Sequence, residues 1–324
     1  MVGNNIYLKK VNKIRKVSRL DKYISSLDIN LSRTKIKELI LNGSVTVNDS
    51  PVKPHYQLKK GDEIRIEYEK KKPFKILGEN ISINILYEDE DIILVNKSAG
   101  MVVHPAAGNL TGTLVNALIG NRKDLRNSGE KARPGVLHRL DKNTSGILVF
   151  AKTDSGHLGI AKQIESRSMH REYIAYVWGN VEFNAGKIDA PIGRNPKNRL
   201  KMSVTNIHSR YALTNYSVLK RYKIITKIKL KLHTGRTHQI RVHMSHIGHP
   251  IVGDPDYGGR LLQIAGKYLK GNINLFNSIL GLIKRQALHA AKLGFIHPSK
   301  NYYIEFNAPP PDDMQHLETY LSQL

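Results

Sequence analysis

Short runs of apolar residues, many of them alternating with polar ones, predict β-strands over most of the chain beyond residue 80. They cover positions 92–95, 147–151, 173–178, 212–219, 228–232 and 302–306. Successive side chains of a strand point to opposite faces, so such runs are typical of strands with at least one buried face. Helical spacing is rarer and favours helices at 114–118, 156–165 and 237–247. These patterns predict an α+β domain with a large, mixed and mainly antiparallel sheet.

The first 75 residues have a different pattern, in which two helices precede small strands. Apolar residues at 20, 23, 24 and 27 have helical spacing, and a second helix is predicted from the N-cap Ser32 to Asn42 and Gly43. Alternation at 45–48 and 64–68 predicts strands. We therefore expect a basic tail (1–15), a small helical and β domain (16–69), a linker (70–80), a larger domain (81–312) and a C-terminal tail (313–324).

The charge of the chain points to a polyanionic partner. Its 324 residues include 51 Lys and Arg against 27 Asp and Glu, a net charge of +24. The first 75 residues alone hold 18 Lys and Arg against 8 Asp and Glu. We find no signal peptide, no long basic amphipathic segment and no run of about 18 apolar residues, which argues against a membrane. Nucleic acid is the expected partner.

The chain has no cysteine, which excludes disulfides, thiolate chemistry and cysteine-based zinc sites. We expect a reducing compartment, the cytoplasm. The phosphate-binding loop of nucleotide-dependent motors is also missing, so no nucleotide cofactor is expected.

Asp141 is the candidate for chemistry. It lies in a turn rich in Gly, Ser and Thr, with Arg139 two positions before it and Lys142 one position after it. Nearby cations favour an ionised carboxylate, which suits nucleophilic or base work at neutral pH. The alternative is a surface turn in which Asp141 bonds the amides that follow it.

Four ordered segments resemble the RluA/RluD family of RNA pseudouridine synthases over residues 80 to 312. The segment His138 to Gly146 matches the family signature that contains the catalytic Asp. The others are 87–105, 233–243 and 288–298. The resemblance implies a catalytic cleft across the sheet and an isomerisation that needs no cofactor. Asp141 would either add covalently to the nucleotide or remove a sugar proton to give a glycal, and both routes stay open.

The resemblance also implies roles for residues around Asp141. Arg139 would fill the space left by the flipped uridine, unless it only pairs with an acid. Tyr173 would contact the uracil and help to move its C5 proton, whereas Tyr176 and Trp178 are expected in the core. Arg241 would pair with Asp141. We assign the motif residues His138 and His238 to substrate binding, together with Arg236, which is a candidate for binding phosphate. For Arg236 and Arg241 the alternative is a purely structural role.

The N-terminal helices and strands resemble the RNA-binding module named after ribosomal small-subunit protein four. The cations expected on phosphate are Arg19, Arg33, Lys35 and Lys37. An ordinary solvated helix face is the alternative. The basic linker from Glu69 to Lys75 could also touch the RNA backbone.

The segment 102–109 is most similar to the RluD branch, which implies large-subunit ribosomal RNA as the substrate and, we expect, a monomeric enzyme. Transfer RNA is one alternative, and a non-catalytic ribosome-assembly factor is another. A metal-dependent nuclease would use His243, His246 and His249 with Asp254 or Asp256, but Gly248 and Pro250 should end the helix first, and we expect no metal. Ser98 and the segment 209–212 depart from the family pattern outside the proposed catalytic positions.

Overall fold

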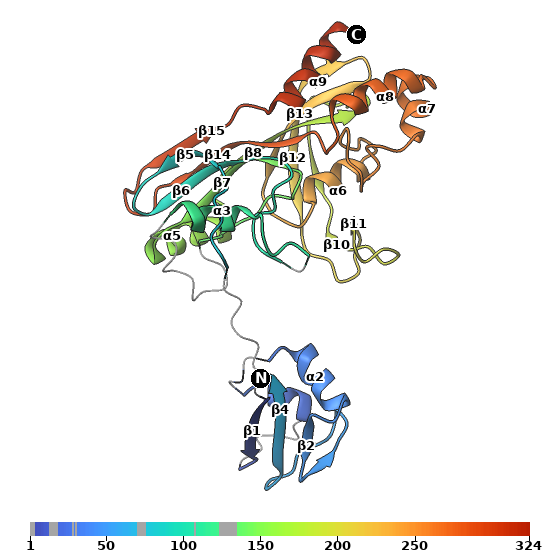
Figure 1. Ribbon diagram of the computed structural model, residues 1–324. Coiled ribbons are helices and arrows are strands. Elements are labelled where there is room, and N and C mark those ends of the chain that lie inside the picture. The colour runs from blue at the N-terminus through green and yellow to red at the C-terminus, as the bar shows by residue number, and fades with distance from the viewer. Residues whose placement is uncertain are drawn as a thin grey trace. The chain divides into compact units, whose positions relative to one another are not determined.

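The computed structural model describes residues 4–12, 19–27, 29, 31–69, 76–106, 108–122 and 135–324. The chain divides into two compact units, Met1–Phe74 and Lys75–Leu324 (Figure 1). None of the helices in the described ranges is long and apolar enough to cross a membrane.

The smaller unit packs two helices on a small antiparallel sheet. Its elements are β1 (Asn4–Lys10), α1 (Leu20–Ser25), α2 (Arg33–Leu41), β2 (Val45–Val47), β3 (Ser50–Pro51) and β4 (Glu63–Glu69). The strand order is β1-β4-β2-β3, and the side chain of Ser32 accepts a hydrogen bond from the Lys35 amide at the start of α2. Leu20, Ile24 and Ile36 are buried in its core. The two helices and the two strands predicted for this unit are confirmed.

The expected N-terminal tail is wrong for residues 4–10, which form β1 and pair with β4 along its whole length. The pairing depends on backbone hydrogen bonds, while Ile6 and Leu8 stay exposed. An edge strand held in this way has little buried apolar surface, so hydrophobic patterning gives a weak signal for it.

The larger unit is built on a nine-stranded sheet within the described residues, with the order β5-β6-β7-β14-β8-β13-β12-β9 and β15 beside β14. Its strands are β5 (Asn84–Glu88), β6 (Ile92–Lys97), β7 (Ser145–Ala151), β8 (His170–Trp178), β9 (Ala185–Asp189), β12 (Leu213–Tyr222), β13 (Ile225–Leu232), β14 (Leu288–Ile296) and β15 (Tyr303–Asn307). A separate hairpin contains β10 (Ile192–Arg194) and β11 (Met202–Val204). The β7–β14 pair is parallel and the others are antiparallel, as the predicted mixed sheet requires.

Helices cover the sheet near both of its ends (Figure 1). They are α3 (Leu114–Asn121), α5 (Asp154–Glu165), α6 (Gln239–His246), α7 (Gln263–Leu269), α8 (Ile273–Leu282) and α9 (Asp312–Gln323). Alternate residues of β6 and β7 belong to two different core clusters, one with α3 and the other with Ile160 of α5. Burial on both faces explains why these two strands are continuous apolar runs.

The predicted core positions Tyr176 and Trp178 are confirmed, because both side chains are fully buried. The Trp178 ring lies 5.8 Å from that of Phe276 in α8, centroid to centroid, and its Nε1 donates to the Gly259 carbonyl at 2.9 Å. Trp178 is the one tryptophan of the sequence, so its fluorescence reports on the larger unit alone.

Two further boundaries differ from the expectation. Residues 312–323 form α9, whose Met314, Leu317 and Leu321 are buried in the main core, so the expected C-terminal tail is wrong. The helical spacing of these three residues could have predicted the helix from the sequence. At the N-terminal end of the larger unit, residues 76–80 of the expected linker belong to this unit, because the Glu79 amide donates to the Asn116 carbonyl at 2.8 Å. Residues 70–75 of the expected linker lie outside the described ranges.

Replacing Leu317 by Ala should destabilise the larger unit by about 2–5 kcal/mol, because the change leaves a cavity in the core. Urea unfolding followed by Trp178 fluorescence measures this loss. Thr319→Ala, on the exposed side of the same helix, is the matched control and should change stability by less than about 0.5 kcal/mol. Equal midpoints for the two variants would contradict a structural role for α9.

Candidate active site

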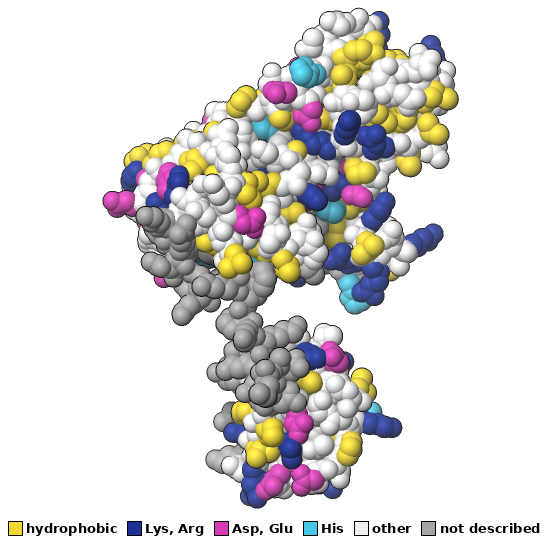
Figure 2. Space-filling view, viewed as in Figure 1, with side chains coloured by type: hydrophobic (Ala, Val, Ile, Leu, Met, Phe, Trp, Pro, Cys, Tyr) yellow, Lys and Arg dark blue, Asp and Glu magenta, His cyan; other side chains and the backbone are white. Residues whose placement is uncertain are grey.

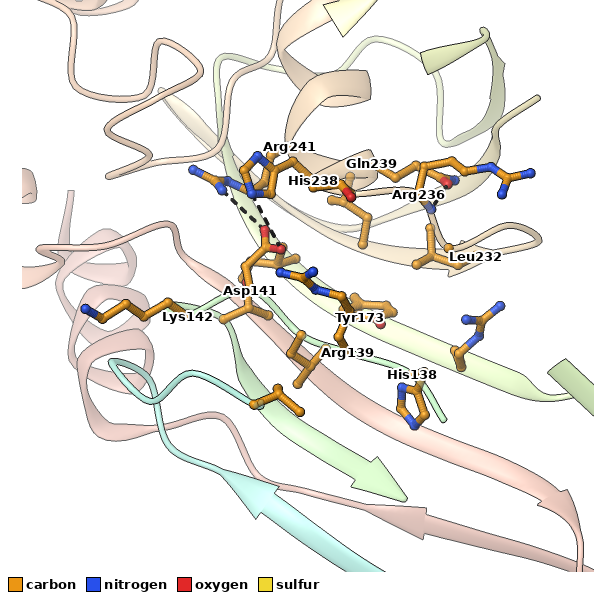
Figure 3. A pocket seen from close by; sticks show the side chains of 18 of the residues that line it. His138, Arg139, Asp141, Lys142, Tyr173, Leu232, Arg236, His238, Gln239 and Arg241 are labelled. Atoms are coloured by element: carbon orange, nitrogen blue, oxygen red, sulfur yellow. Dashed lines mark hydrogen bonds and ion pairs between the residues drawn. The ribbon is translucent and has the colours of Figure 1, made fainter. Parts of the chain in front are cut away.

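The predicted site residues of the larger unit line one cavity of about 910 Å³. Its walls come from the loops 102–106 and 136–144, the start of β8, the segment 232–241 and Asp256 (Figure 3). Segments more than 150 positions apart in the sequence therefore meet around Asp141.

The turn that holds Asp141 is fixed by two buried cations that bind its backbone. The ammonium of Lys97 donates to the carbonyls of Ser98, Met101 and Lys142 at 2.8–3.1 Å. Arg285 donates to the Asn143 carbonyl at 3.1 Å. Lys97 and Arg285 thus bind the two successive carbonyls that follow Asp141.

Burial, reinforced by the charge of Arg285, lowers the pKa of Lys97 to about 7, and the charge of Asp141 opposes this shift. The three carbonyl acceptors match the three N–H groups of an ammonium. Lys97 and Arg285 had no role in the sequence-based prediction, since both act on backbone atoms that have no sequence signature.

Gly146 explains how β7 can begin directly behind this turn. A Cβ at this position would lie 2.2 Å from the Ala290 carbonyl oxygen, and the backbone has φ +116°, which favours glycine. The adjacent Ser145 hydroxyl is 2.9 Å from Nδ1 of the buried His289, whose Nε2 is 3.1 Å from the Ala308 carbonyl. The close β7–β14 contact thereby fixes the start of the strand and the loop before it.

Arg241 joins three carboxylates at the cavity wall. Its Nη1 donates to Oδ2 of Asp141 at 3.2 Å, and its Nε and Nη2 donate to the buried Asp254 at 2.7 and 2.8 Å. Nη2 also donates to Asp256 at 2.6 Å. Burial opposes the charge of Arg241, but the hydrogen bonds and charge of Asp254 and the charge of Asp141 raise its pKa above the usual value.

His238 lies beside the other carboxylate oxygen of Asp141 (Figure 3). Its Nε2 lies 3.8 Å from Oδ1 of Asp141, and its Nδ1 lies 2.7 Å from the hydroxyl of Tyr257. The Met202 amide donates to that hydroxyl oxygen at 3.0 Å, so the phenolic proton is free to go to Nδ1. In the neutral ring this leaves the proton on Nε2, facing the carboxylate. Burial lowers the pKa of His238, and the charge of Asp141 opposes this.

Tyr173 is 7% exposed and lines the cavity from β8. Burial and the charge of Asp141 raise the pKa of its phenol, while the charge of Arg171 acts in the opposite direction. His138 also lines the cavity, where its Nε2 accepts from the Val149 amide at 3.3 Å. Burial and the charge of Arg171 lower the pKa of His138 to about 3, so the ring is neutral at physiological pH.

Neither of the cations next to Asp141 in the sequence forms an ion pair with it, so the alternative in which Arg139 pairs with Asp141 is not observed, whereas the predicted pair with Arg241 is. Lys142 is exposed and directed away from the carboxylate, and Arg139 is among the exposed residues lining the cavity (Figure 3). Within the described ranges Arg139 has no ion-pair partner, and Asp141 pairs with Arg241, 100 positions further along the chain. The loop conformation explains this, since it turns the adjacent side chains to different sides.

Arg236 lines the same cavity, and its Nε donates to the Tyr211 carbonyl at 2.9 Å. The residues considered for a metal site are engaged elsewhere. His243 bonds Thr214 and the Ala190 carbonyl, His249 bonds the Trp178 carbonyl, and α6 ends at His246. No group of three His, Asp or Glu residues in the described part of the chain could hold a metal.

In the smaller unit, two of the four predicted RNA-binding cations are paired. Arg19 binds the buried Asp21 at 2.8 Å, and Lys35 binds Glu38 at 2.6 Å. Arg33 and Lys37 are exposed, lie one helical turn apart on α2 and have no ion pair with any described residue.

Comparisons with known proteins show the family of the chain. The RNA pseudouridylate synthase family model matches residues 91–246, and the S4 domain model matches residues 18–64. YlyB of Bacillus subtilis, named an uncharacterised RNA pseudouridine synthase, is 43% identical over 94% of both chains. Ribosomal large subunit pseudouridine synthase D of Zymomonas mobilis is 43% identical over 92% of both chains.

A solved structure supports the fold. Human RNA pseudouridylate synthase domain containing 1 aligns with a TM-score of 0.53 and 24% identity, covering 76% of this chain and 97% of its own. Because a relative more than 30% identical matches nearly the whole length, the chain belongs to the RNA pseudouridine synthase family, as an isomerase that acts on RNA and has an N-terminal S4 domain.

Proposed function

We propose that the chain converts uridines of large-subunit ribosomal RNA to pseudouridine, with Asp141 as the catalytic residue. The observation that supports this most strongly is the placement of Asp141 in the cavity, held by Arg241 and facing the same space as Tyr173. The relatives named ribosomal large subunit pseudouridine synthase D support the choice of substrate. Such a substrate implies a cytoplasmic enzyme, and a site built by one chain supports a monomer.

The reaction breaks the bond between C1′ and N1 and forms one between C1′ and C5, so atoms are conserved and no cofactor is consumed. Asp141 either adds to the nucleotide or removes a sugar proton, and the new glycosidic bond then forms after the base has turned. Arg241 serves both routes, because it fixes one carboxylate oxygen and leaves Oδ1 on the side of His238.

Tyr173 has a separate role in the last step, in which C5 loses a proton and N1 gains one. Since its pKa is raised, the phenol is protonated in the free enzyme. A protonated phenol can accept the C5 proton only while it passes its own proton on. We therefore assign Tyr173 to stacking on the uracil and to relaying this proton.

Positively charged residues beside the cavity support contact with RNA around the site. The β10–β11 hairpin has cationic residues at Arg194, Lys197, Arg199 and Lys201, and Lys and Arg side chains gather over it (Figure 2). Lys201 donates to the Asp256 carbonyl at 2.7 Å, which connects the hairpin to the loop that binds Arg241. The unpaired Arg139 suits the replacement of a flipped base.

Pseudouridine mapping of large-subunit ribosomal RNA tests the proposed function. Cells with Asp141→Asn should lose discrete pseudouridines that cells with the wild-type chain contain, because the amide can neither add to the nucleotide nor act as a base. Identical maps in large-subunit RNA but loss in transfer RNA would change the substrate. Identical maps in both would favour a non-catalytic binding factor, and chelator-sensitive strand scission would favour a nuclease.

Replacing Asp254 by Asn should destabilise the larger unit by about 3 kcal/mol, because the buried Arg241 then loses a charged partner. The same variant should lower kcat, since Arg241 is no longer held toward Asp141. Asp256→Asn changes a 44% exposed partner of the same guanidinium and should cost at most about 1 kcal/mol. Urea unfolding by Trp178 fluorescence compares the two, and equal effects would refute the proposed importance of the buried pair.

The S4 domain should contribute phosphate contacts through Arg33 and Lys37. Affinity for an unmodified large-subunit ribosomal RNA transcript should fall with salt, and Arg33→Ala/Lys37→Ala should reduce the slope of log affinity against log salt by about 1.4 to 1.8. Lys35→Ala, which removes a cation already paired with Glu38, is the matched control and should have a smaller effect. An unchanged slope in the double variant would remove this face from the RNA interface.

A further inference from the structure

Arg171 is a buried cation in the cavity wall that has no partner among the described residues. It lies on β8, two residues before Tyr173 and on the same face of the strand. Its exposed fraction is 7%, and its Nε is buried without a hydrogen bond. No described residue forms an ion pair or a hydrogen bond with its guanidinium.

The other buried arginines of the described residues are neutralised by carboxylates. Arg241 binds Asp254, and Arg285 binds Asp313 at 2.7 Å. A guanidinium cannot shed its proton to escape the cost of burial, so an unpaired one is expensive to keep in the free protein. Arg171 is therefore the exception, and it faces the substrate cavity.

The cavity wall that holds Arg171 contains two more arginines. Arg167 and Arg236 line the same cavity, and the pKa of Arg236 is lowered by burial and by the charges of Arg210 and Arg167. A Cβ at Gly235 would lie 3.2 Å from Nη1 of Arg171, so the guanidinium packs against the backbone beside Arg236. Arg167 lies over the ring of Tyr211, 5.6 Å from its centroid.

We propose that Arg171, together with Arg236 and Arg167, forms a phosphate subsite that binds a phosphodiester next to the flipped uridine. The planar guanidinium of Arg171 matches two non-bridging phosphate oxygens. An uncharged uracil carbonyl would leave the charge of this cluster uncompensated, which favours an anion. The inference rests on the proposed function for the identity of the anion, although inorganic phosphate has the same chemistry.

This subsite would set the position of the nucleotide. Because Arg171 and Tyr173 share one strand face, a phosphate on the first and a base on the second are held at a fixed separation. The RNA then supplies the counter-charge that the free protein lacks, and this gain can offset the cost of unstacking the uridine.

Thermal unfolding of the full chain, followed by Trp178 fluorescence, tests the subsite without RNA. In chloride buffer Arg171→Met should raise the Tm by about 2–4 °C, because a buried unpaired charge is replaced by an apolar side chain. Inorganic phosphate at the same ionic strength should raise the Tm of the wild type. The same addition should leave Arg171→Met unchanged.

Lys284→Met, which removes an exposed charge outside the cavity, should respond to phosphate like the wild type. If Arg171→Met does not fold, Arg171→Lys should retain a weaker response, because it keeps the charge and loses the fork. A lower Tm for a folded Arg171→Met with an undiminished phosphate response would overturn the subsite.

Single-turnover kinetics on an unmodified large-subunit ribosomal RNA transcript test the RNA side. Arg171→Met should raise the RNA concentration for half-maximal rate by about 10- to 100-fold, the loss expected for a charge-assisted pair, and affect the maximal rate less. A fall in the maximal rate alone would mean that Arg171 acts on the reacting uracil and would overturn the subsite. If the wild type forms no pseudouridine there, the proposed function fails, while the phosphate-dependent Tm decides the anion site by itself.

Discussion

The ion pair between Arg241 and Asp141 is the interaction on which the site depends. One guanidinium donates to Asp141, Asp254 and Asp256, which belong to two loops more than 100 residues apart. A planar group with five fixed donors can hold three acceptors at defined angles, whereas an ammonium would hold them loosely. The direction of the Asp141 carboxylate is therefore set by a group outside its own loop.

The Asp141 loop itself is fixed through its backbone. Lys97 and Arg285 bind the carbonyls of residues 142 and 143 from the end of β6 and from the segment between α8 and β14. Lys97 ends β6, a strand buried on both faces, and Arg285 is fixed by Asp313 of α9. The C-terminal helix thus reaches the Asp141 loop through one arginine, which gives it a role beyond covering the core.

Sequence reasoning predicted the α+β class, the longer strands and the group Asp141, Tyr173 and Arg241, because motifs and alternation are local signals. It correctly paired Asp141 with Arg241, but the charges of Arg139 and Lys142 do not act on the carboxylate through an ion pair, because adjacency in the chain does not fix which way a loop turns its side chains. Lys97 and Arg285 act on carbonyl groups, and Arg171 is defined by the absence of a partner. Contacts with distant carbonyl groups and the lack of a partner both arise only when the fold brings distant segments together. The helix α9, by contrast, has a helical pattern of apolar residues that could have predicted it from the sequence.

The distribution of buried charge separates what the protein stabilises by itself from what RNA must complete. Arg241 and Arg285 have carboxylate partners, so they fix the scaffold in the absence of substrate. Arg171 and the exposed Arg139 have none within the described residues, and both face the cavity. An enzyme that must unstack a base needs binding energy that appears only with the substrate. Cations that are unpaired in the free protein provide that energy when RNA pairs with them. They lower the stability of the free protein, and the ion pairs of Arg241 and Arg285 offset this loss.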